Sequence, residues 1–73
     1  MSESVKTRLA EIDAPYGRRL WLDNVAYESG MELLRLTIRE GARYTILELD
    51  AATARSFAQA MSDWARARPP AAG

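Results

Sequence analysis

Residues 33–50 read LLRLTIREGARYTILELD, and the alternation of apolar and polar side chains along them predicts two adjacent strands. Leu34, Leu36 and Ile38 alternate with polar residues, which is typical of a strand with two unlike faces. A second alternating run covers residues 44–49, after the turn at Gly41. A hairpin loop with an even number of residues places Leu34, Leu36 and Ile38 on one face with Thr45, Leu47 and Leu49. An odd loop would set these leucines beside charged residues, so the hydrophobic pattern favours the even register.

The same segment ends on Asp50, a good N-cap residue for a helix that follows at once. Residues 51–68 are rich in helix formers and contain no glycine or proline, so they predict one helix. An apolar stripe runs along it at three- and four-residue steps: Ala54, Phe57, Ala58, Met61, Trp64 and Ala65. We interpret the stripe mainly as core packed on the sheet, and alternatively as a partner-binding element. Residues 1–68 therefore form one predicted domain, and residues 69–73 a disordered tail.

Towards the N-terminus, residues 20–28 predict a further strand, with a tight hairpin turn at Ser29 and Gly30. Pairing across this turn puts Val25 opposite Leu34 and Trp21 opposite Ile38, facing the helix. Asp23 would then also point inward. A bulge near Asp23 and Asn24 would expel it, turning Trp21 outward and Leu20 and Leu22 inward. The sequence leaves both orientations of Trp21 open.

Val5, Thr7 and Leu9 alternate with basic residues and predict a first strand, followed by turn residues at 13–17. The predicted fold is therefore α+β. It is a four-stranded antiparallel meander sheet with one C-terminal helix packed on one face, in the order ββββα.

The composition disfavours catalysis and metal binding. The 73 residues include no cysteine, which removes thiolate ligands. They also include no histidine, which removes the commonest metal ligand and the commonest general base. The carboxylates are scattered, and no phosphate-cradling glycine loop or nucleophile motif occurs. We expect no enzyme activity, no metal and no cofactor.

Small size and charge balance favour self-association in the cytoplasm. A domain this short buries a small core and often gains stability from a disulfide, a metal or a second copy, of which only the last is available. Ten acidic and ten basic residues cancel, so no long-range field attracts nucleic acid or membrane. Residues 1–8 are polar and no apolar run approaches the ~18 residues of a membrane span, so we expect a cytoplasmic protein.

The sheet face opposite the helix carries a mixture of apolar and arginine side chains, and we predict it as an interaction surface. Its candidate residues are Trp21, Leu33, Arg35, Thr37, Arg39, Tyr44 and Ile46. One interpretation is a homodimer contact, through this face or a sheet edge. A second is a stacking platform for single-stranded nucleic acid. In the third, Arg35 pairs across the strands with Glu48 and the face only stabilises the sheet.

The order of four strands and one helix, with residues 44–50 running from the last strand into the helix, resembles the single-stranded-DNA-binding transcriptional coactivators. That resemblance rests on topology and implies a dimer of similar length; no site residue is carried over from it. The chain is also similar to short uncharacterised bacterial domains with a strand-rich start and an Ala- and Arg-rich final helix.

Overall fold

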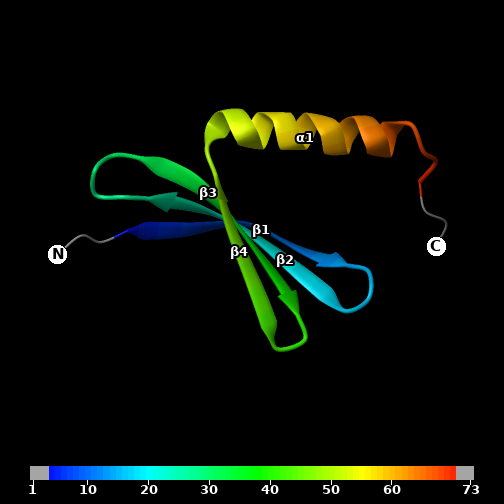
Figure 1. Cartoon of the computed structure of the whole chain (residues 1–73), viewed down its shortest axis with the longest axis horizontal. Coiled ribbons are helices and arrows are strands. Elements are labelled where there is room, and N and C mark those ends of the chain that lie inside the picture. The colour runs from blue at the N-terminus through cyan, green and yellow to red at the C-terminus, as the bar shows by residue number, and fades with distance from the viewer. Residues whose placement is uncertain (1–3, 71–73) are drawn as a thin grey trace.

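A computed structural model describes residues 4–70 and confirms the predicted ββββα order. Four strands form one antiparallel meander sheet in the spatial order β1-β2-β3-β4, and a single helix follows. Figure 1 shows the helix as a separate layer along one side of the twisted sheet. The elements are β1 (Val5–Ala14), β2 (Arg18–Ala26), β3 (Glu32–Glu40), β4 (Arg43–Leu49) and α1 (Ala51–Arg66).

The register of β3 and β4 is the predicted one. Glu40 pairs with Arg43 across a two-residue loop, so Leu34 lies opposite Leu49 and Leu36 opposite Leu47. Gly41 in this loop has φ +60°, a conformation that glycine adopts without steric cost.

The predicted pairing of β2 with β3 is wrong by one residue. Val25 lies opposite Leu33, and Trp21 opposite Thr37 rather than Ile38. Residues 27–31 connect the two strands. Within them the Tyr27 amide donates to the Met31 carbonyl (2.8 Å), which closes a three-residue loop at residues 28–30 in place of the two-residue turn expected at Ser29 and Gly30. A shift of one residue moves every β2 side chain to the other face.

The predicted bulge at Asp23 and Asn24 is also absent from the pairing of β2 with β3, which is regular over residues 18–26. The irregularity lies on β1, where Leu9 is inserted between Arg8, opposite Asp23, and Ala10, opposite Leu22. The outward orientation of Trp21 therefore results from the register and not from a bulge in its own strand.

Several element boundaries differ from the prediction. β2 covers Arg18–Ala26 rather than residues 20–28. β1 continues to Ala14 and leaves a three-residue turn before Arg18, so Asp13 lies in the strand and not in the turn. The helix ends at Arg66 instead of residue 68. There the Arg68 amide donates to Ala65, and the residue before a proline disfavours helical geometry. Of the predicted tail, residues 71–73 lie outside the described residues.

The core is small. Among the described residues, Val25 (1% exposed) and Leu49 (9% exposed) are the only buried hydrophobic side chains. α1 approaches the sheet chiefly at β3, and no helix residue is buried. The predicted helix core is therefore not closed within one chain, since Phe57, Met61 and Trp64 remain 43%, 53% and 62% exposed.

No helix in the described part of the chain is both long and apolar enough to cross a bilayer.

Candidate interaction surface

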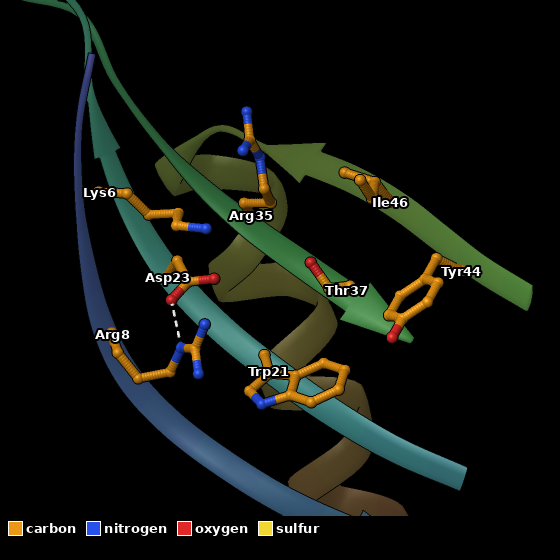
Figure 2. Close-up of a pocket in the computed structure, with 8 residues that line it drawn as sticks. All are labelled: Lys6, Arg8, Trp21, Asp23, Arg35, Thr37, Tyr44 and Ile46. Atoms are coloured by element: carbon orange, nitrogen blue, oxygen red, sulfur yellow. Dashed lines mark hydrogen bonds and ion pairs between the residues drawn. The ribbon is translucent and has the colours of Figure 1, made fainter. Parts of the chain in front are cut away.

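The face of the sheet turned away from α1, which we call the open face, carries a shallow hollow. Figure 2 shows its side chains in front of the strands, with the helix behind them. Five of the seven predicted surface residues line it, together with three that the sequence analysis did not select. The lining residues are Lys6, Arg8, Trp21, Asp23, Arg35, Thr37, Tyr44 and Ile46. Leu33 and Arg39 share this face by strand alternation but do not line the hollow.

Asp23 forms the floor of the hollow. Its side chain is 2% exposed, and its Oδ1 accepts a hydrogen bond from Arg8 Nε at 2.6 Å. Arg8 also donates to Glu11 at 3.1 Å. The hydrogen bond from Arg8 to Asp23, with the negative charges of Asp23 and Glu11, raises the pKa of the arginine against the opposing effect of desolvation. A buried carboxylate needs such a partner, and this pairing removes the conflict that a helix-facing Asp23 would create.

Arg35 on β3 forms an ion pair with Glu48 on the neighbouring strand β4. Its guanidinium donates twice to Glu48, at 2.9 and 2.6 Å. This is the cross-strand pair predicted by the interpretation in which the face only stabilises the sheet. Tyr27 reaches the same carboxylate with its hydroxyl at 2.9 Å. The hydrogen bonds from Arg35 and then Tyr27 lower the pKa of Glu48, while the hydrogen bond to Glu48 raises the pKa of Arg35. The positive charge of Arg35 is thereby paired with a carboxylate of the same chain.

The aromatic part of the face lies between β2 and β4. The rings of Trp21 and Tyr44 have centroids 6.4 Å apart and planes 19° apart, so they stack. The guanidinium carbons of Arg8 and Arg39 each lie 5.8 Å from the Trp21 ring, within the range of a cation–π interaction.

Arg39 differs from the other arginines of this face. Its cross-strand neighbours are Arg19 and Tyr44, and no ion pair joins it to a carboxylate within residues 4–70. Its Nε is buried without a hydrogen-bond partner in that range. Within residues 4–70, Arg39 is therefore the arginine of this face whose charge is not paired with a carboxylate.

Asp23, Arg8 and Lys6 belong to this face but were not among its predicted residues. A register shifted by one residue on β2 assigned Asp23 to the wrong side, and the pairing of the first strand with the second, which sets Arg8 opposite Asp23, was not predicted. The pair of Arg8 and Asp23 could have been predicted from charge, because an aspartate within a strand is stabilised by a basic residue opposite it on the neighbouring strand. Among residues 4–70, no group of three or more acidic side chains gathers as a metal site.

The fold and this face define a small α+β sheet domain with one ion-paired outer face. The chain belongs to DUF6967, a family of unknown function whose model matches residues 3–67. No curated protein matches the chain. No solved structure matches it either. The likeness to single-stranded-DNA-binding coactivators thus rests on the order of elements alone.

Proposed function

We propose that this domain is a non-catalytic interaction module that acts as a homodimer. The observation that carries the proposal is the surface of the single chain. A compact protein of 8.2 kDa is expected to expose roughly 4,500 Å². This chain exposes 5903 Å². The radius of gyration agrees, at 14.6 Å against about 11 Å expected for a compact chain of this length.

The excess is sufficient for a dimer. It amounts to roughly 1,400 Å², while a stable interface of standard size buries about 800 Å² on each partner. Burial of the exposed apolar side chains would also give the domain the core that one chain lacks, at about 25 cal/mol for each Å² removed from water. The absence of net charge leaves no overall repulsion between two copies.

Light scattering across a wide concentration range tests the proposal. We expect a mass near twice that of the chain at high concentration, falling towards the single-chain mass on dilution. A constant single-chain mass at every concentration would refute self-association.

A second candidate function is weak binding of single-stranded nucleic acid by the open face. The stacked Trp21 and Tyr44 rings beside Arg39 support it, because bases stack on aromatic rings and phosphates bind free arginines. The ion pairs of Arg8 and Arg35 limit the net positive charge of this face.

A labelled single-stranded oligonucleotide, titrated at low and high salt, tests this second function. Binding that weakens as salt rises, and that is lost in Arg39→Gln, supports it, because phosphate contacts release counterions. Absence of binding at low salt rules it out.

A further inference from the structure

The side of the sheet next to α1, which we call the helix side, is apolar and incompletely covered. Strand register and alternation place five apolar side chains on this side, and each retains solvent exposure: Leu20, Leu22, Leu36, Ile38 and Leu47. Charged side chains occur at its rim, where Arg18 pairs with Glu40.

The helix adds a second uncovered apolar surface. Phe57, Met61 and Trp64 lie on one face of α1, at steps of four and three residues, and all three are exposed. Ala54, in the first half of the helix, is the least exposed helix residue. The second half of α1 therefore presents its apolar stripe to solvent.

Three polar residues on the opposite face of α1 hydrogen-bond to one another. Asp63 accepts hydrogen bonds from Gln59 and Arg66, both at 2.8 Å. A contact through the apolar stripe leaves this network in water.

The two sides of the sheet differ in the cost of burial. The open face holds several ion pairs, including Arg8 with Asp23 and Arg35 with Glu48, whose exposed members would lose solvent in a contact. Removing ion pairs from water costs free energy that their mutual attraction often does not return. The centre of the helix side holds no charge, so its burial yields hydrophobic stabilisation without that cost.

We infer that the occupant of the helix side is a second copy of this chain. Two copies face each other through their helix sides, with the stripe of Phe57, Met61 and Trp64 from each α1 enclosed between the two sheets. The excess exposed surface, roughly 1,400 Å², is larger than the area of about 800 Å² that each partner buries in a standard dimer interface. This inference rests on the proposed self-association and assigns the surface that carries it, in place of the open face or sheet edge expected from the sequence.

Two methionines provide a test in the unaltered chain. Met31, in the loop between β2 and β3, is 54% exposed, and Met61 in α1 is 53% exposed, so dilute hydrogen peroxide should oxidise both at similar rates in the monomer. Peptide mass spectrometry follows each rate at low and high protein concentration. We expect Met61 to oxidise about fivefold or more slowly at high concentration, because the monomer fraction alone reacts, with Met31 unchanged.

Matched charge insertions test the same surface. Met61→Glu should raise the dissociation constant by about tenfold or more, because a dimer would bury the new carboxylate without a partner. Ser62→Glu, on the polar side of the same turn, and Ile46→Glu, on the open face, should leave it within about twofold. Circular dichroism confirms that each variant keeps its helix.

The outcomes separate the two proposals. A dimer in which Met61 oxidises as fast as Met31, and which Ile46→Glu dissociates, overturns the helix-side contact and leaves self-association in place on the open face. A monomer at every concentration overturns both.

Discussion

At the scale of single residues, stability depends on a few enclosed side chains. Val25 is the most buried hydrophobic residue described, yet it shares the outward side of β2 with Trp21 and Asp23. Tyr27 and Arg35, both bound to Glu48, belong to the same network of the open face. The open face is thus partly a small core of its own.

Val25→Ala should therefore lower the free energy of unfolding by about 2 kcal/mol, from lost burial and the cavity left behind. Val5→Ala removes the same atoms at a position that is 66% exposed. It should change the free energy by less than about 0.5 kcal/mol. Urea unfolding of both variants at one fixed protein concentration makes the comparison. Equal losses would contradict the enclosed position of Val25.

We expect Glu48 to make the stability of the domain depend on pH. Its pKa is lowered in the folded chain, chiefly by the hydrogen bond from Arg35 and then by that from Tyr27. A carboxylate with a lowered folded pKa adds stability above its unfolded pKa, near 4.5, and loses it as the pH falls through the folded value.

Glu48→Gln should therefore flatten the fall in unfolding free energy below about pH 4.5. Glu28→Gln, in the exposed loop between β2 and β3, is the control, since Glu28 has no ion-pair partner within residues 4–70. Denaturant titrations from pH 6 to pH 3 measure the slopes. If Glu48→Gln and the natural chain show the same slope, the network does not contribute as described.

At the scale of elements, the decisive feature is register. The pairing of β3 with β4 could be predicted because a two-residue loop joins strands whose alternation tolerates one parity only. The pairing of β2 could not be predicted, because residues 27–31 can close a two-residue turn or a three-residue loop, and each gives a chemically plausible face. Of the two predicted alternatives, only the one with a bulge in β2 turned Trp21 and Asp23 away from the helix, as the structure has them. The bulge itself occurs on β1.

The bulge on β1 makes a deletion informative. Removing Leu9, which is 58% exposed, should leave Arg8 opposite Asp23 and Ala10 opposite Leu22 in an uninterrupted ladder. We expect that deletion to retain cooperative thermal unfolding. Deleting Thr37 from the middle of β3 should abolish it, because the strand would present opposite faces on either side of the gap. Circular dichroism melts that reverse this order would contradict the register.

At the scale of the whole molecule, the sequence indicated self-association from length and composition, and it identified the apolar stripe of α1. It could not tell what covers that stripe, because periodicity shows which face of a helix is apolar and not which surface meets it. The structure shows Phe57, Met61 and Trp64 uncovered beside an apolar sheet, and a chain more extended than its length requires. This combination supports the proposed helix-side dimer.

The most direct test of that dimer is an isotope-filtered nuclear Overhauser experiment on a mixture of labelled and unlabelled chains, which detects proton contacts between copies only. The helix-side dimer predicts contacts from the Met61 methyl group and the Trp64 indole of one copy to the other. Contacts confined to Ile46 and Tyr44, or none at concentrations where the chain is dimeric by mass, would contradict it.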